Sequence, residues 1–394
     1  MSGYLQFLPF APKHFAPPHN GLLEQFIAKM HSLTEMWNLL LQFLSAGGAV
    51  PAALPVHRPG SLSNHSWVTD FSNLVTFGDS YTDESRLQYF QTHNGSAPPP
   101  GLLLPESNST AGGGITWSRF VSTNTGAKLY DYAVNGAVCS NEIIFRLLTS
   151  IHMPFPDVVY EVDAFEADVT YVNTATGTNT LYTDRQPENT VYSMWIGTND
   201  LGVNAFLTDS SLNMTTIPDY VDCIFDRFDD IYGSGGKYFV LMNTAPLQLS
   251  PLYGMPGEGG LATSSYWTDK ASRPPSNTSE ISGKMKEYTQ LVNTIFDYRV
   301  PFELKIAKRY PGAKMAIFDI NSLMTDMFNN PSQYFTAPAN VTGTYTGCGK
   351  SSCPYSLDHF MWYDDLHPSQ RSDEIIAIEF AKVVDGSSTY AVYW

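Results

Sequence analysis

Five short apolar runs, spread along the chain, constrain its fold more than any other feature. They are LVTF (74–77), KLYDYAV (128–134), VYSMWI (191–196), KYFVLMN (237–243) and KMAIFDI (314–320). Strands that read as near-continuous apolar runs are usually buried on both faces, and parallel strands need long crossover connections like those that separate these runs. The pattern therefore predicts an α/β fold with a central, mainly parallel sheet of about five strands.

Helices are predicted at 282–300, which ends before Pro301, and at 368–384, which opens with Pro368 in its first turn. Three long segments between the runs are rich in Gly, Pro, Ser, Thr and Asn: residues 91–116, 172–190 and 247–280. Loops of this length inside a compact domain are usually functional or disordered. We interpret them as exposed walls around a cleft, with passive surface decoration as the alternative.

The chain is acidic, with a formal net charge of −16 and a sequence pI of about 4.8. Proteins that bind nucleic acids present basic patches to the phosphates, so we expect no nucleic-acid partner. The sequence contains no His-Glu-x-x-His motif and no Cys-x-x-Cys pair. Because both are typical metal-binding patterns, we predict neither a metal site nor a cofactor. The protein is expected to be a monomer.

The segment MWNLLLQFLSAGGAVPAALP (36–55) has an apolar core followed by small residues. This is the pattern of a signal peptide that is too short to span a bilayer. We therefore expect translation to start at Met30 or Met36, and the signal peptide to lie within residues 30–53. The chain then divides into an N-terminal extension (1–53), a Pro-rich linker (54–69) and one large domain (70–394), in a secreted protein without a stable membrane span. A disordered or weakly helical extension of a cytosolic protein is the alternative.

The cysteines and the glycan acceptor sequences bear on the same question of compartment. Cys348 and Cys353 close the small polar loop CGKSSC, a spacing that suits a local disulfide in a secreted protein. Cys139 and Cys223 form either a second bridge or two buried thiols. Acceptor sequences for N-linked glycans (Asn-x-Ser/Thr) occur at Asn64, Asn94, Asn108, Asn213, Asn277 and Asn340.

The first apolar run ends in the turn sequence Phe-Gly-Asp-Ser, which places Ser80 just after a strand. Open α/β folds have their sites at the carboxyl edge of the sheet, so Ser80 is a candidate nucleophile as well as a candidate helix N-cap. A serine nucleophile needs a histidine base and a carboxylate that orients this base. The sequence WYDDLHPSQR supplies both, because Asp364 lies three residues before His367. Asp365 is the neighbouring carboxylate, and His359 is interpreted as structural.

Two further strand ends provide hydrogen-bond donors for an oxyanion. MWIGTNDLG presents the side-chain amide of Asn199, and YAVNGAVCS presents the bare backbone N–H of Gly136. Each fragment alone is typical of a structural turn, and we expect Asp79 and Asp200 to cap such turns. A serine, a glycine, an asparagine and an Asp-x-x-His pair in this order predict a serine hydrolase.

These four blocks resemble those of the GDSL or SGNH hydrolases. FGDSY matches with Ser80, NGA with Gly136, GTND with Asn199 and DDLHP with Asp364 and His367. The resemblance covers about residues 70–390, and it implies a three-layer α/β/α sandwich. It also implies an oxyanion hole formed by the N–H groups of Ser80 and Gly136 and the amide of Asn199. The sequence around the blocks is most similar to the fungal secreted acetylesterases of carbohydrate esterase family sixteen.

The resemblance implies hydrolysis of short-chain acetyl esters through an acyl-enzyme on Ser80, with O-acetyl groups of hemicellulose-derived oligosaccharides as the substrates. Tyr81, which takes the place of the motif's leucine, and Trp362 are candidate substrate-binding residues. Trp362 is a candidate platform for a sugar ring, with core packing as the alternative. A lipase or phospholipase of the same family and an inactive carbohydrate-binding protein on the same fold are the competing functions. An α/β-hydrolase is disfavoured, because the sequence has no Gly-x-Ser-x-Gly elbow.

Overall fold

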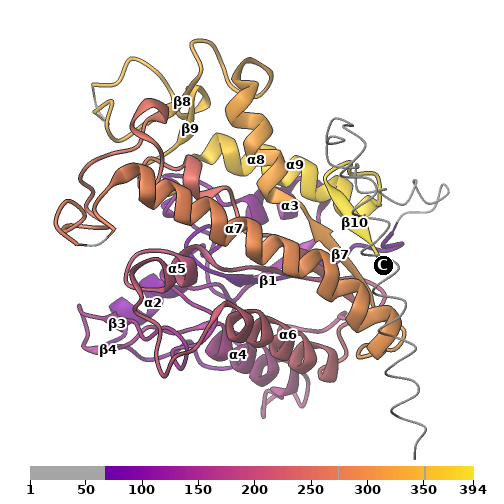
Figure 1. Ribbon diagram of the computed structural model, residues 1–394. Helices are drawn as coiled ribbons and strands as arrows, with labels where there is room; N and C mark the ends of the chain where they lie inside the picture. Colours follow the sequence, from indigo (N-terminus) through magenta and orange to yellow (C-terminus); the bar gives the residue numbers. More distant parts are fainter. Residues whose placement is uncertain (1–66, 274, 350–351) are drawn as a thin grey trace, which may run out of the picture. The chain divides into compact units, whose positions relative to one another are not determined.

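A six-stranded sheet forms the centre of the protein in a computed structural model that describes residues 67–273, 275–349 and 352–394 (Figure 1). In spatial order the strands are β10 (Ala391–Tyr393), β7 (Lys314–Phe318), β6 (Tyr238–Met242), β5 (Thr190–Trp195), β1 (Asn73–Gly78) and β2 (Lys128–Asp131). All neighbours pair in parallel except β10, which runs antiparallel to β7. The structure confirms the predicted α/β fold and all five predicted strands. The sixth strand was not predicted.

Helices cover both faces of this sheet and make the three layers that the sequence predicted (Figure 1). On one face, α6 (Ile217–Gly233) packs between α4 (Val158–Thr170) and α7 (Thr278–Pro301). On the other face, α3 (Trp117–Thr125) packs against α9 (Gln370–Asp385). Shorter elements are α2 (Arg86–Thr92), α5 (Thr198–Leu201), α8 (Ile320–Asn329), a π-helical turn (Phe302–Ala307) and two small ladders, β3 (Leu147–Leu148) with β4 (Met153–Pro154) and β8 (Asn340–Thr344) with β9 (Phe360–Trp362).

Both predicted helices are present, with starts that differ from the prediction. The first begins at Thr278, because the side chain of Asn277 accepts the N–H of Ser279 and caps the first turn. The second begins only at Gln370, because Ser369 is the N-cap and accepts the N–H of Ser372. Pro368 therefore lies before the cap and not in the first turn, which corrects the prediction.

Two disulfides fasten the loops of this fold. Cys139 and Cys223 are joined across 84 residues, which ties the segment after β2 to α6. Cys348 and Cys353 are joined across 5 residues. The predicted local bridge is therefore present, and of the two alternatives left open for Cys139 and Cys223 the structure has the bridge.

The predicted signal peptide, its boundary at residue 53 and Asn64 lie outside the described residues. The end of the predicted linker belongs to the packed fold, because Trp67 and Val68 are buried and donate backbone hydrogen bonds to the carbonyls of Asp385 and Val384. Among the residues that the structure describes, no helix is long and apolar enough to cross a membrane.

Candidate active site

The site is built at the carboxyl edge of the sheet, where β1 and β5 end side by side. Gly78, the last residue of β1, pairs with Trp195, the last residue of β5. Gly78 has φ +148°, and a Cβ atom at this position would lie 2.2 Å from the carbonyl oxygen of Trp195. A glycine is therefore required where the chain turns out of the sheet, and this turn brings Ser80 to the edge.

Ser80, His367 and Asp364 form one hydrogen-bonded chain. The Oγ atom of Ser80 lies 2.8 Å from Nε2 of His367, and both residues are buried. Both carboxylate oxygens of Asp364 lie 3.0 Å from Nδ1 of His367. When Nδ1 carries the proton and donates it to Asp364, Nε2 is left to accept the proton of Ser80. The structure thus brings together the three residues that the sequence singled out, although they come from two ends of the domain.

Asp364 is held in place by more than the histidine. Its Oδ1 atom accepts the backbone N–H groups of Leu366 at 2.9 Å and His367 at 2.8 Å. Burial alone would raise the pKa of the Asp364 carboxyl, but the hydrogen bonds and the charge of His367 outweigh burial and lower it. Asp365 has a different contact, because its Oδ2 atom accepts the hydroxyl of Ser264 at 2.7 Å.

Of the two predicted oxyanion donors, Gly136 lies in the loop after β2 and Asn199 lies in the short helix α5, and these two segments are hydrogen-bonded to each other. The Nδ2 atom of Asn199 donates to the carbonyl of Ala137 at 2.8 Å, which leaves its second N–H for another acceptor. Gly136 has φ +94°, and a Cβ atom there would lie 2.6 Å from the ring of Phe155. Arg146 donates from Nη1 to the carbonyl of Gly136 at 2.8 Å, so the peptide on the far side of this residue is also fixed.

Three buried carboxyl groups from three different elements hold the loop that contains Gly136. Each accepts a backbone N–H of this loop: Glu161 from Val134 at 3.1 Å, Asp83 from Asn135 at 2.7 Å and Asp200 from Cys139 at 2.8 Å. Burial raises the pKa of all three carboxyls, that of Asp200 to about 7. Asp200 therefore does more than cap the turn in which it lies: its carboxyl accepts its own backbone N–H and also the N–H of Cys139, 61 residues away in the chain. Asp79 does cap its own turn, by accepting the N–H of Tyr81 at 3.0 Å.

The two predicted substrate-binding aromatic residues are buried, which corrects both predictions. Tyr81 is 3% exposed, its ring packs against Trp195 and His367, and its hydroxyl donates to the carbonyl of Leu366 at 2.8 Å. It supports the segment next to His367 instead of offering a surface to substrate. Trp362 is 0% exposed in β9, and its Nε1 atom donates to the carbonyl of Val341 at 3.1 Å. Core packing, the alternative for Trp362, is what the structure has.

An exposed aromatic residue beside the triad, Tyr266, was missed by the sequence reasoning. It lies in the 247–280 insertion, its side chain is 41% exposed, and its hydroxyl donates to Oδ2 of Asp364 at 2.7 Å. The sequence around it, SSYW, has no fixed spacing to the triad and so gave no signal. This insertion therefore lies beside the triad.

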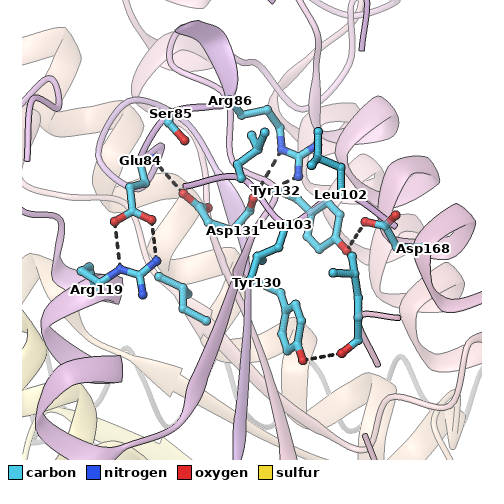
Figure 2. Close-up of a pocket in the computed structure, with 13 residues that line it drawn as sticks. Glu84, Ser85, Arg86, Leu102, Leu103, Arg119, Tyr130, Asp131, Tyr132 and Asp168 are labelled. Atoms are coloured by element: carbon cyan, nitrogen blue, oxygen red, sulfur yellow. Dashed lines mark hydrogen bonds and ion pairs between the residues drawn. The ribbon is translucent and has the colours of Figure 1, made fainter. Parts of the chain in front are cut away.

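Of the other two insertions, 172–190 covers a different part of the sheet, and 91–116 joins that part to the residues after His367. The 172–190 segment is bonded to the end of α4 through Asn179 and to β2 through the hydroxyl of Tyr130. The 91–116 segment crosses from β2 toward the residues after His367, where the N–H of Ile115 donates to Gln370. Figure 2 shows the hollow between these segments and β2. Its polar side chains are paired with one another or with backbone: Arg119 with Glu84, Arg86 with the carbonyl of Asp131, Tyr132 with Asp168 and Tyr130 with the carbonyl of Leu181.

Within the described residues no three His, Cys, Asp or Glu side chains are grouped so that they could hold a metal ion. Four of the predicted glycan acceptors have exposed side chains: Asn94, Asn108, Asn213 and Asn277. Asn340 is half-buried, and its Oδ1 atom accepts the N–H of Gly343.

The family model described as GDSL-like Lipase/Acylhydrolase matches residues 74–380. An acetylesterase of Hypocrea jecorina is 43% identical over 331 residues, which cover 82% of this chain and 92% of the relative. An acetylesterase of Thermothelomyces thermophilus is 22% identical over 324 residues, 80% of this chain and 88% of the relative. Among solved structures, the α/β hydrolase LAE5 from the Lake Arreo metagenome has a TM-score of 0.39 and 12% identity over 81% of this chain and 96% of its own.

Proposed function

The chain belongs to the GDSL-like lipase/acylhydrolase family, and we propose that it removes acetyl groups from carbohydrates by forming an acyl-enzyme on Ser80. The observation that carries this proposal is the contact of 2.8 Å between the Ser80 hydroxyl and Nε2 of His367, with Asp364 on the other ring nitrogen. A nucleophile, its base and the group that orients the base are thereby in hydrogen-bond reach of one another.

In the first half-reaction the Oγ atom of Ser80 attacks the ester carbonyl carbon while His367 accepts the serine proton at Nε2. The negative oxygen of the tetrahedral intermediate is stabilised by the N–H groups of Ser80 and Gly136 and by the free N–H of Asn199. His367 then gives its proton to the leaving alcohol, and the acetyl group stays on Ser80. In the second half-reaction His367 takes a proton from the water molecule that attacks the acetyl-enzyme, and it returns this proton to Oγ of Ser80 as acetate leaves.

An acetylated carbohydrate is favoured as substrate for two reasons. The two fungal relatives reported above are acetylesterases. The exposed ring of Tyr266 lies 5.4 Å from the ring of His367, close to the group that protonates the leaving alcohol, and an aromatic surface there suits a sugar ring. Beside the triad, the described part of the 247–277 segment contains only short 3₁₀ turns, Leu247–Leu249 and Pro256–Glu258. An interfacial lipase would need an amphipathic lid with a broad apolar face.

The test is a chain-length series of aryl esters, run beside acetylated xylo- and manno-oligosaccharides. We expect kcat/KM to be highest for acetyl and to fall steeply beyond butyryl, with acetate released from the oligosaccharides. Rising activity toward octanoyl and longer esters, with activation at a lipid interface, would favour the lipase alternative. Binding of the oligosaccharides without acetate release would favour the inactive carbohydrate-binding protein.

We further propose that the protein is secreted and glycosylated and acts as a monomer. Two disulfides support an oxidising compartment, and four acceptor asparagines are exposed. N-terminal sequencing of protein from the culture medium of the native host should give a start near residue 50, and glycosidase treatment should lower its mass. Light scattering should give the mass of one chain, and an intact intracellular Met1 would contradict secretion.

A further inference from the structure

We propose that Tyr266 is a positioning residue that holds Asp364 against His367 and is itself held there by an insertion fastened to Asp365. The proposal rests on the proposed function, because it assigns a role in the same triad. The sequence motifs do not include Tyr266, and its insertion lies between β6 and α7, far along the chain from Ser80.

The side chain of Tyr266 contacts two residues of the triad. Its hydroxyl lies 2.7 Å from Oδ2 of Asp364 and 3.3 Å from Nδ1 of His367. Burial and the neighbouring Asp364 carboxylate both raise the pKa of the tyrosine, so the hydroxyl keeps its proton and is the donor. Asp364 thus has backbone donors on Oδ1 and a side-chain donor on Oδ2. With both oxygens bonded, the carboxylate cannot rotate away from the imidazole without losing a hydrogen bond.

Hydrogen bonds to Asp365 hold the insertion that contains Tyr266. The hydroxyl of Ser264 donates to Oδ2 of Asp365 at 2.7 Å and accepts the N–H of Tyr266 at 3.2 Å. The carbonyl of Asp365 accepts the N–H of Leu252 at 2.7 Å, and the buried ammonium of Lys270 donates to the carbonyls of Leu252 and Leu261. The two adjacent aspartates therefore have separate tasks. Asp364 orients the histidine, and Asp365 holds the loop that brings Tyr266 to Asp364.

The role predicts a specific effect on pH dependence. Asp364 and Tyr266 face His367 at its Nδ1 atom. Tyr81 and Asp79 face it from the turn after β1. Asp365 and Tyr363 lie beside Tyr266. The tyrosine hydroxyl takes up part of the negative charge of Asp364. When it is removed, more of this charge acts on the imidazolium that forms during turnover, so we expect the acid limb of the kcat/KM profile to change.

The first experiment compares Tyr266→Phe with wild type in kcat, KM and the pH profile of kcat/KM on an aryl acetate. We expect kcat to fall on the order of 10-fold with KM within about twofold, because one charge-assisted hydrogen bond is lost while the ring stays. The acid limb of the kcat/KM profile should move to higher pH. Tyr355→Phe is the matched control, since Tyr355 is 40% exposed and packs on His359 away from the triad. Tyr355→Phe should change neither kcat nor the pH profile of kcat/KM. Unchanged kcat and pH profile in Tyr266→Phe would overturn the proposal.

The second experiment is a double-mutant cycle with Ser264→Ala, which removes both hydrogen bonds of that hydroxyl. If Ser264 acts through Tyr266, it should lower kcat in the wild-type background and have little further effect in Tyr266→Phe. Additive losses would contradict the fastening role. Thermal melting and phosphonate labelling of each variant report whether it is folded. Ser80→Ala separates the two levels: if it stays active the proposed function fails, whereas an inactive Ser80→Ala with a fully active Tyr266→Phe overturns only this inference.

Discussion

At the scale of single residues, the two adjacent aspartates before His367 give the sharpest contrast. Asp364→Asn replaces the carboxylate at Nδ1 by an amide that can donate, which favours the wrong histidine tautomer. We expect kcat to fall by about 10⁴-fold, as for triads of this type. Asp365→Asn keeps an acceptor for Ser264 and should lose far less. Steady-state kinetics of the two variants give the ranking, and the reverse order would mean that the wrong carboxylate was assigned to the triad.

Asn199 is predicted to act on the transition state and not on substrate binding. Its amide donates one N–H to the carbonyl of Ala137, and its second N–H is free to donate to the oxyanion. Asn199→Ala should therefore lower kcat by about 100- to 1,000-fold with little change in KM. A change confined to KM would show that the amide binds the substrate instead.

The sequence could identify those site residues that stand in a recognisable pattern with their neighbours along the chain. Ser80 follows a strand, and Asp364 and His367 are three residues apart, so both could be found without knowing the fold. Tyr266 reaches Asp364 from 98 positions away, through a loop whose path depends on many weak contacts. Trp362 was misjudged because its distance from Asp364 along the chain does not say which side of β9 it occupies.

At the scale of elements, the loop that follows β2 positions one of the predicted oxyanion donors. Its residues 134–139 contain Gly136 and are fixed by the buried carboxyls and by the bridge from Cys139 to α6. We expect the double variant Cys139→Ser/Cys223→Ser to lose about 4 kcal/mol of unfolding free energy, because this bridge closes a long loop. Its kcat should also fall, since the oxyanion donor is less well fixed.

The other disulfide supplies the matched control. Cys348 and Cys353 lie only 5 positions apart in the chain, and about 2 kcal/mol is expected for closing so short a loop; both cysteines are far from Gly136 in sequence. The variant Cys348→Ser/Cys353→Ser should therefore keep its kcat. Urea unfolding and steady-state kinetics are measured for both double variants. Equal losses of kcat in the two would contradict a role for the Cys139–Cys223 bridge in holding the site.

The elements themselves were predictable to different degrees. The five parallel strands were visible because burial on both faces leaves an uninterrupted apolar run. Strand β10 has only three half-buried residues at the sheet edge, which is too short for a pattern. The start of α9 was misplaced by two residues because proline suits both the first turn and the position before a serine cap.

At the scale of the whole molecule, the buried carboxyls predict a protein that is more stable in mild acid than at neutral pH. Burial raises the pKa of Asp79 to about 6 and that of Asp200 to about 7. Unfolded aspartates release their protons near pH 4. Between these values the folded state binds more protons than the unfolded state, so the free energy of unfolding falls as the pH rises from about 4 to about 7. Asp364 has the opposite sign: its lowered pKa adds stability above about pH 4 that is lost as the pH falls.

Melting temperatures measured between pH 4.5 and 8 test this prediction. The wild type should melt several degrees lower at pH 8 than at pH 5, and Asp200→Asn, which has no proton to lose, should show a smaller difference. A wild-type melting temperature that rises over this range would show that other groups dominate the pH dependence of stability.

Ester hydrolysis by the mechanism proposed above requires that Ser80 is the nucleophile, and covalent labelling tests this most directly. An aryl organophosphonate is incubated with the protein, and the intact mass and the labelled peptide are measured together with residual esterase activity. We predict a single phosphonyl group on Ser80, loss of activity in proportion to labelling, and no labelling of a folded Ser80→Ala variant. Full activity of a protein labelled on Ser80, or activity lost through a label on another residue, would contradict the assignment of Ser80 as the nucleophile.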